Sequence, residues 1–410
     1  MNQRLERLDE LAGALSSARD ELIAGIVRSA KKAYRVAAGE VDLALRRLAA
    51  FHDVPPLLAG REPVGTVVIV FPGNASLSNP VATIGTAFLA GNRVLARFPR
   101  SAGAWAAQIE PLLTAHLPGV RFDHGPGPDF LRAVLADPDV SVIMVFGDDS
   151  WADGYEPLIR AARKKFIFEG PGKDPFLVLP GADLDRAARD AVRGAYYNAG
   201  QACTSPERFY VHRDLAAEFL ERVVERTRSE VLGAPEHPET TVGPIVSRRV
   251  AARIAAQLQD AVARGARVLA GGGLRSATLA DGTPATYVEP TVLADVTAEM
   301  AIMQEETFGP VIPVQVVADT AEALAFADAS PYGLAANLYG GGEAERATLA
   351  RSHGQVFNEE IWLDYFSRHL HAPYGGRKRS GWVWEWLEDR FVHRDGLRTN
   401  AVEFSQAAGT

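Results

Sequence analysis

The sequence has a single cysteine, Cys203, in 410 residues. One cysteine excludes an internal disulfide and a cluster of thiolate metal ligands, so no metal site is expected. The same scarcity fits a reducing, intracellular compartment, and we expect a cytoplasmic protein. Because a lone cysteine is usually a small buried apolar residue, a chemical role for it has to be supported by the rest of the chain.

The sequence also has no long run of basic residues and no apolar core of a secretory signal. The net charge is −8, and the basic runs at residues 164–165 and 377–379 are too short to form a stripe. A nucleic-acid partner is therefore not expected. Residues 1–32 carry charges throughout and have no apolar signal core, so they predict amphipathic helix and not a leader.

Residues 63–92 carry no charged side chain, as a membrane span would. Proline, glycine and asparagine at positions 72–74 and 79–80 interrupt this run, and a spanning helix would expose their polar groups to lipid. We interpret the run as a buried strand, a polar turn and a buried helix, without membrane contact.

A chain of 410 residues with 47% hydrophobic residues can bury a large core in two or three domains. Apolar runs at residues 66–71, 93–97, 140–146 and 165–169 predict parallel strands with helices between them. This alternation is typical of a doubly wound α/β domain, which binds ligands where its strands end. A second α/β block is expected from residue 173 onward. The tail from residue 398 predicts a mobile segment with one short strand at 401–404.

Cys203 falls on a turn between a predicted helix and a predicted strand. Asp183 is placed to cap a helix with apolar residues at helical spacing, and Asn198 and Gly200 end that helix. Residues 207–212 alternate like a strand. A thiol on such a turn can face a cleft with backbone N–H groups around it, as a nucleophile and its oxyanion donors require.

Seven short motifs follow one another along the chain. Together they resemble the motifs of the aldehyde dehydrogenase superfamily, whose members depend on NAD(P). The resemblance covers roughly residues 60–390. The motifs are Arg61-Glu-Pro-Val-Gly65, Phe168-Glu-Gly-Pro-Gly-Lys173, Asn198-Ala-Gly-Gln-Ala-Cys203, Glu305-Glu-Thr-Phe-Gly-Pro-Val311, Ser330-Pro-Tyr-Gly-Leu334, Asn358, and Pro373-Tyr-Gly-Gly-Arg-Lys-Arg-Ser-Gly381.

The resemblance implies an aldehyde dehydrogenase-like α/β fold. Residues 1–172 would form a Rossmann-type cofactor domain to which 376–397 return, and residues 173–375 a catalytic domain that carries Cys203. Residues 398–410 would supply a C-terminal oligomerisation strand or tail. The first oligomerisation arm is reduced to residues 55–60, so a homodimer is expected in place of a tetramer.

The resemblance also assigns three catalytic residues. Cys203 matches the nucleophile, whose thiolate attacks an aldehyde to give a thiohemiacetal and then a thioester. Glu169 matches the general base that activates water or takes the thiol proton. Asn74 matches the asparagine that holds the oxyanion together with the backbone N–H of the cysteine.

Cofactor contacts are implied at the strand ends and after the cysteine turn. Arg97 and Arg100 occupy the positions where the family has a lysine and a glutamate on the adenosine ribose. Two guanidinium groups suit a 2′-phosphate, so NADP is favoured over NAD. Asp148 and Asp149 replace the usual small residues of the phosphate turn, which leaves the cofactor's affinity or pose open. The other implied contacts are Phe71, Pro72, Gly147, Ser150, Glu306 and Phe308.

The substrate is a small-molecule aldehyde, for which the sequence offers four contact candidates. Thr83 stands where the family has a buried lysine, so any proton relay behind Glu169 is altered. Tyr365, Arg368 and His371 come from the loop before residue 373. An aromatic wall with cationic tips suits an aromatic or acid-bearing aldehyde.

Two other functions stay open at this stage. The same scaffold can reduce an acyl thioester, bound to CoA or a carrier, to an aldehyde. Glu169 argues against that reaction, whereas Thr83 and the turn at residues 72–74 keep it possible. The second alternative is a catalytically silent binding or scaffolding protein, against which Cys203, Glu169, Asn74 and Glu306 all argue.

Overall fold

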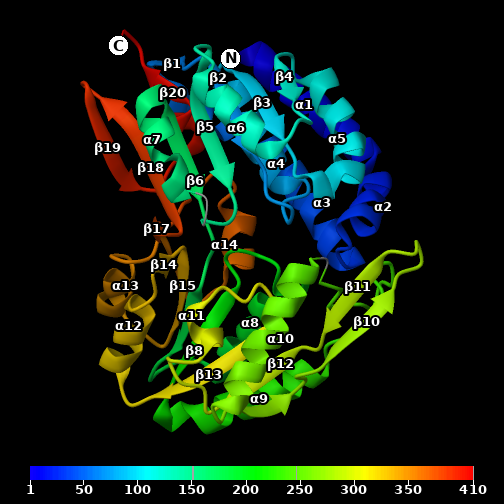
Figure 1. Cartoon of the computed structure of the whole chain (residues 1–410), viewed down its shortest axis with the longest axis vertical. Helices are drawn as coiled ribbons and strands as arrows, with labels where there is room; N and C mark the ends of the chain where they lie inside the picture. The colour runs from blue at the N-terminus through cyan, green and yellow to red at the C-terminus, as the bar shows by residue number, and fades with distance from the viewer. Residues whose placement is uncertain (150–151, 246, 410) are drawn as a thin grey trace.

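The computed structural model describes residues 1–149, 152–245 and 247–409. These residues contain two seven-stranded sheets, one in the upper and one in the lower half of Figure 1. Blue and cyan helices lie beside the upper sheet, and α14 (Trp362–Arg368) lies between the two halves. The doubly wound α/β class expected from the sequence is confirmed.

The first sheet has the strand order β19-β18-β6-β5-β2-β3-β4. Its strands from β6 to β4 are parallel, whereas β18 and β19 are antiparallel. The segment after residue 376 thus returns to the sheet that the first part of the chain builds. The strands are β2 (Thr66–Val70), β3 (Arg93–Arg97), β4 (Val120–Phe122), β5 (Val140–Phe146), β6 (Lys165–Glu169), β18 (Gly381–Leu387) and β19 (Arg390–Asp395).

Helices cover both faces of this sheet, which explains why its parallel strands are apolar on both sides. Val67 and Ile69 of β2 pack with the N-terminal helices, whereas Val68 packs with α6 and α7. The uncharged run at 63–92 forms β2, a turn and α4, as interpreted from the sequence. The helices are α1 (Asn2–Ser17), α2 (Arg19–Ala30), α3 (Tyr34–Ala49), α4 (Ser78–Leu89), α5 (Gly103–His116), α6 (Gly127–Ala136) and α7 (Ala152–Ala162), with short 3₁₀ turns η1 (Ala50–Asp53) and η3 (Arg100–Ala102).

The second sheet has the order β16-β15-β7-β8-β13-β12-β9 and is parallel except for β9. Its strands are β7 (Asp174–Val178), β8 (Pro206–His212), β9 (Arg267–Ala270), β12 (Thr291–Ala294), β13 (Val311–Val317), β15 (Ala335–Tyr339) and β16 (Gln355–Asn358). Helices α8 (Leu184–Tyr196), α9 (Arg213–Arg228), α10 (Arg248–Ala263), α11 (Ala301–Gln304), α12 (Thr320–Asp328) and α13 (Glu343–Leu349) accompany it. The 3₁₀ turn η4 (Tyr197–Gly200) follows α8. Two further pairs are the hairpin β10 (Leu274–Thr278) with β11 (Pro284–Val288), and β14 (Tyr332–Gly333) with β17 (Arg377–Lys378).

The C-terminal segment differs from the sequence prediction. The strand expected at 401–404 is wrong: α15 (Asn400–Glu403) is helical there, because Ala401 and Phe404 turn toward the core at helical spacing. The strand comes later, as β20 (Ser405–Ala407), and pairs with β1 (Arg61–Pro63) of the same chain. The described part of the tail is therefore tied into the fold.

The region expected to hold the reduced oligomerisation arm contains the 3₁₀ turn η2 (Pro55–Leu58). Proline at its start suits a tight helical turn and cannot complete a strand ladder. Across the described ranges, no helix combines the length and the apolar character needed to cross a membrane.

Candidate active site

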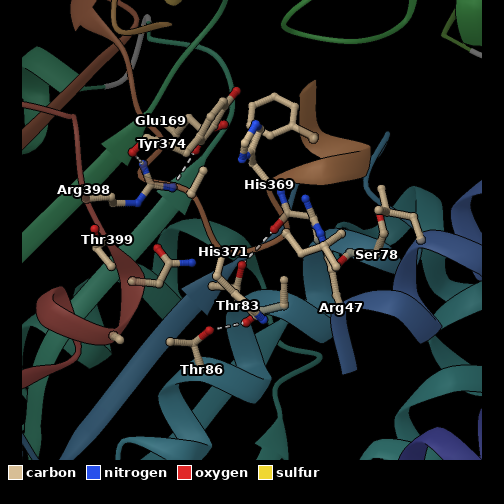
Figure 2. A pocket seen from close by; sticks show the side chains of 18 of the residues that line it. Arg47, Ser78, Thr83, Thr86, Glu169, His369, His371, Tyr374, Arg398 and Thr399 are labelled. Atoms are coloured by element: carbon tan, nitrogen blue, oxygen red, sulfur yellow. Dashed lines mark hydrogen bonds and ion pairs between the residues drawn. The ribbon is translucent and has the colours of Figure 1, made fainter. Parts of the chain in front are cut away.

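A cavity of about 220 Å³ lies where the two sheets and the N-terminal helices meet. Figure 2 shows Glu169, Tyr374 and Arg398 together at one side of it and Arg47 and His371 at another. Cys203 lines the same cavity. The candidate nucleophile and the candidate base are thus brought to one space from two different sheets.

The turn before Cys203 has an unusual backbone. Asp183 caps α8 as predicted, since its carboxylate accepts from the backbone N–H groups of the first turn. Asn198, Ala199 and Gly200 then take left-handed φ angles of 53°, 54° and 72°. A side chain at Gly200 would come within 2.3 Å of the Gly309 backbone, so glycine is required there. Three left-handed residues in succession reverse the chain and carry the cysteine to the cavity.

The environment of Cys203 keeps its thiol protonated. Burial raises the pKa of Cys203, and the negative charge of Glu169 raises it further. The Sγ atom lies 3.6 Å from the Tyr374 hydroxyl, and this contact opposes the rise in pKa. Because the thiolate is the nucleophilic form, the site needs a base that takes the proton as the thiol reacts.

Glu169 ends β6 and is almost completely buried. Burial raises its pKa, whereas the charge of Arg398 and hydrogen bonds from Arg398 and Tyr374 lower it. The Arg398 Nη2 atom donates to Glu169 Oε2 at 2.6 Å, and both side chains are 3% exposed. The carboxylate is therefore positioned by a buried cation from the segment for which the sequence predicts a mobile tail.

Tyr374 and Arg398 reach the site as a pair. Their backbones exchange two hydrogen bonds, Tyr374 N to Arg398 O at 2.7 Å and Arg398 N to Tyr374 O at 2.9 Å. This isolated antiparallel bridge brings residues 24 positions apart side by side. The motifs alone do not predict that Tyr374 and Arg398 contact Glu169, because this contact depends on how the C-terminal segment folds back onto the first sheet.

Asn74 lies against the cysteine turn. Its Nδ2 donates to the Gln201 carbonyl at 3.3 Å, so the amide faces the loop that carries Cys203. Lys32 holds the Asn74 carbonyl at 2.7 Å and pairs with buried Glu40. The position agrees with the oxyanion role that the resemblance implies, and that role stays a prediction.

Glu40 organises the turn that bears Asn74. Its Oε1 accepts from the backbone N–H groups of Ser76 at 2.9 Å and Leu77 at 2.7 Å. With Lys32, this buried carboxylate has three partners. It accepts hydrogen bonds from two backbone N–H groups of the turn, because the uncharged segment 63–92 has no carboxylate of its own for them. Sequence reading missed Glu40, because its amphipathic helix gave no sign of a partner outside the helix.

The carboxyl ends of β2 and β5 form the implied cofactor edge. Phe71 is buried and stacks on Phe98 and Phe146, at centroid distances of 5.3 and 6.1 Å. Pro72 follows it at the start of the turn. Gly147 has a φ of 143° and donates its N–H to the Glu169 carbonyl at 3.0 Å. The expected phosphate turn is thus bonded to the strand that ends in the candidate base.

The two arginines expected at the adenosine end have different surroundings. Arg97 is buried; its guanidinium donates to Asp123 at 3.0 Å and to the Gly125 carbonyl at 2.9 Å. Arg100 begins η3 and is exposed. Of the two, Arg100 is the cation more accessible to a phosphate.

The aspartates of the expected phosphate turn each have a cationic partner. Asp148 pairs with Arg249 at 3.3 Å, and Asp149 pairs with Arg379. A side chain built at Gly147 would meet no atom within 4 Å, so open space lies over the turn. With its carboxylates compensated, this edge fits a dinucleotide phosphate. Ser150, the remaining phosphate-turn candidate, lies outside the described residues.

Glu306 and Phe308 lie on the loop before β13. Glu306 Oε1 accepts from the Gly172 N–H at 3.1 Å, and burial together with nearby Glu207 raises its pKa to about 8. Phe308 has a left-handed φ of 54°, and its N–H donates to Glu207 at 2.6 Å. Glu207 also accepts from Lys173 at 2.8 Å. This buried pair fixes the loop, and the sequence reading missed Glu207.

The four substrate candidates divide into two groups. Thr83 and His371 line the cavity, with the Thr83 hydroxyl donating to Asn79 at 2.9 Å. Tyr365 and Arg368 do not line it; Arg368 is 56% exposed and pairs with Glu360. A cationic residue that does line it, Arg47, comes from α3 and was not predicted.

Comparison with known proteins agrees with this geometry. A family model described as the aldehyde dehydrogenase family matches residues 1–392. The succinate-semialdehyde dehydrogenase 1 of Mycobacterium ulcerans, whose name specifies NADP+, is 33% identical over 325 residues, or 78% of this chain and 69% of that protein. The succinate-semialdehyde dehydrogenase of Mycobacterium leprae, whose name also specifies NADP+, is 31% identical over 380 residues, or 91% of this chain and 80% of that protein. The crystal structure of the aldehyde dehydrogenase KauB from Pseudomonas aeruginosa matches with a TM-score of 0.86 at 26% identity, over 98% of this chain and 82% of that one. The chain therefore belongs to the aldehyde dehydrogenase family.

Proposed function

We propose that this protein oxidises an aldehyde to a carboxylic acid, with NADP+ as the preferred acceptor. The observation that carries the proposal is that Cys203, Tyr374 and Glu169 line one cavity, with a hydroxyl between the thiol and the carboxylate. The names of the two mycobacterial relatives, which specify succinate semialdehyde and NADP+, support the same class of reaction.

The first half of the reaction joins Cys203 to the aldehyde carbon. Because burial raises the pKa of the thiol, its proton has to leave as the S–C bond forms. We assign this transfer to Tyr374, whose oxygen takes the thiol proton while its own proton passes to Glu169. The carbonyl oxygen becomes an anion, for which the Cys203 backbone N–H and the Asn74 amide are the assigned donors.

The second half releases the acid. When bound, NADP+ would supply hydride acceptance, the oxidation that formation of a thioester on Cys203 requires. Glu169, having returned its proton to solvent, then takes a proton from the attacking water. The C–S bond breaks, the acid leaves, and the Cys203 thiolate takes the proton back from Glu169 through Tyr374, which restores the thiol and the carboxylate. Burial raises the pKa of Glu169 and so makes it the stronger base that this step needs.

Replacement of the nucleophile tests the proposal directly. Cys203→Ala should reduce aldehyde oxidation to less than about a hundredth of the wild-type rate, since no other group can form the thioester. NADPH formation is followed with a panel of aldehydes, and an unchanged circular dichroism spectrum is the control for folding. A variant that keeps its activity contradicts the mechanism. Wild-type protein that reduces acyl-CoA faster than it oxidises aldehydes would establish the thioester reductase instead.

The preference for NADP+ is tested at Arg100. Loss of its guanidinium should raise the Kd of NADP+ about ten- to a hundredfold, the equivalent of one or two charged hydrogen bonds. The Kd of NAD+ should change little, since NAD+ has no 2′-phosphate. Both are measured by fluorescence titration of Arg100→Ala, with Arg132→Ala, which removes an exposed cation from α6, as the matched control. Equal losses for both cofactors would contradict the assignment.

A further inference from the structure

The cavity has a second polar end, away from the cysteine. Figure 2 shows Arg47 rising from α3 toward His369 and His371, across the cavity from Glu169 and Arg398. We propose that Arg47, with His371 beside it, binds a carboxylate at the far end of the aldehyde substrate. The inference rests on the proposed function and names its substrate class, a short aldehyde that carries an acid group.

Arg47 is a half-buried cation with an unused donor. Its Nη1 donates to the Ser78 carbonyl at 3.0 Å, whereas its Nε is buried without a hydrogen-bond partner. Burial lowers the pKa of Arg47 to about 10, so the side chain is still charged at neutral pH. A buried charge with an open donor is costly unless an anion pairs with it, and a guanidinium suits the two oxygens of a carboxylate.

His371 places a second polar atom at the same end. Its Nε2 is buried and has no hydrogen-bond partner. Burial and the charge of Arg47 lower the pKa of His371, so the imidazole is neutral at pH 7. The neutral ring adds polarity next to the guanidinium without adding a second positive charge.

The rest of the cavity favours a small monoanionic group. Among the described residues, Arg47 and Arg398 are the arginines that line the cavity, and Arg398 is already paired with Glu169. One available cation matches the single charge of a carboxylate better than the two charges of a phosphate ester. Leu43, Ala82 and Leu370 contribute apolar walls to the cavity of about 220 Å³, which suits the aliphatic part of a short aldehyde.

Two nearby arginines serve as comparisons. Arg46 is the neighbour of Arg47 on α3, but it is exposed and donates to the Ser367 carbonyl at 3.0 Å. Arg368, the cation that the sequence analysis singled out, is exposed and paired with Glu360. Neither lines the cavity. If Arg47 is the receptor, only its replacement should separate acidic from neutral aldehydes.

The experiment compares succinate semialdehyde with butanal, an uncharged aldehyde of the same carbon number. Wild-type protein should have a kcat/KM at least about tenfold higher for the semialdehyde. Arg47→Met should lower that value about ten- to a hundredfold, mainly through KM, and leave butanal nearly unchanged. Arg47→Lys should restore part of the loss, and Arg46→Met should change neither substrate. Equal losses for both substrates in Arg47→Met, or discrimination that is lost in Arg368→Met instead, would overturn the inference.

A binding measurement separates this inference from the proposed function. Calorimetric titration with succinate should detect binding to wild-type protein and a Kd at least about tenfold weaker for Arg47→Met. If the protein binds succinate in this way but oxidises no aldehyde, the proposed function fails and the carboxylate subsite stands. If butanal is oxidised while succinate does not bind, the carboxylate subsite fails and the function stands.

Discussion

In the proposed chemistry, the hydroxyl of Tyr374 passes the proton of Cys203 to Glu169. Its hydroxyl is within 3.6 Å of the Cys203 sulfur and also hydrogen-bonds Glu169. Burial and the neighbouring thiol and carboxylate raise its pKa well above the ordinary value, so the hydroxyl stays protonated through the working pH range. A group that keeps its proton and has a partner on each side can pass a proton without itself becoming ionised.

Removal of this hydroxyl should slow the formation of the thiolate. In Tyr374→Phe the ring is kept, but the hydrogen bond that lowers the Cys203 pKa is lost, so that pKa should rise further. We expect kcat to fall about ten- to a hundredfold, near the lower end of what a proton-transfer group contributes. Alkylation of Cys203 by iodoacetamide, followed against pH, should move to higher pH. A loss of rate with an unmoved alkylation profile would assign Tyr374 a packing role only.

The catalytic role of a single residue could be predicted where the residue lies in a short sequence motif. Cys203 and Glu169 were singled out from short motifs, and the structure puts both on one cavity. Tyr374 lies in a family motif that does not indicate its role, and Arg398 falls in the segment for which the sequence predicts a mobile tail. Their contact with Glu169 is long-range, and no spacing in the sequence encodes it.

At the scale of elements, the helices and strands with a regular apolar pattern could be predicted from the sequence. The strands at 66–70 and 140–146 and the capped helix after Asp183 lie where their patterns indicated. The turn between β2 and α4 was expected, but its support was not. Glu40 and Lys32 come from the N-terminal segment and bond the turn's backbone from more than 30 residues away.

The C-terminal elements show why the strand predicted at 401–404 is wrong. The segment 401–404 has only four residues. Its few apolar positions cannot distinguish the two-residue period of a strand from the 3.6-residue period of a helix. The tertiary contact decided the outcome, because Phe404 is fully buried and Glu403 binds Lys165 and Arg394. Arg97 illustrates the same limit, since its partner Asp123 could not be predicted from a local pattern, and the cofactor contact expected of Arg97 stays a prediction.

For the whole molecule, the last segment closes the fold and completes the site. β20 pairs with β1 across almost the entire length of the chain, and Arg398 crosses to Glu169 on the first sheet. A buried ion pair adds little net stability, but removal of one partner leaves a buried charge. The homodimer expected from the sequence stays a prediction, whereas the contribution of this segment to stability can be tested in a single chain.

Arg398→Met should destabilise the folded chain by about 3–5 kcal/mol at neutral pH, since Glu169 is then buried as an uncompensated anion. The pKa of Glu169 is already above its value in the unfolded chain, and without its cation it should rise further. Protonation at lower pH then removes the buried charge, so the variant should approach wild-type stability as the pH falls. The double variant Glu169→Gln/Arg398→Met should be more stable at neutral pH than Arg398→Met alone, because no charge is left unpaired. Urea denaturation of the wild type, both single variants and the double variant at two pH values measures this coupling. If the double variant is as unstable as the two single losses added together, Arg398 acts by packing and the ion pair does not hold the base.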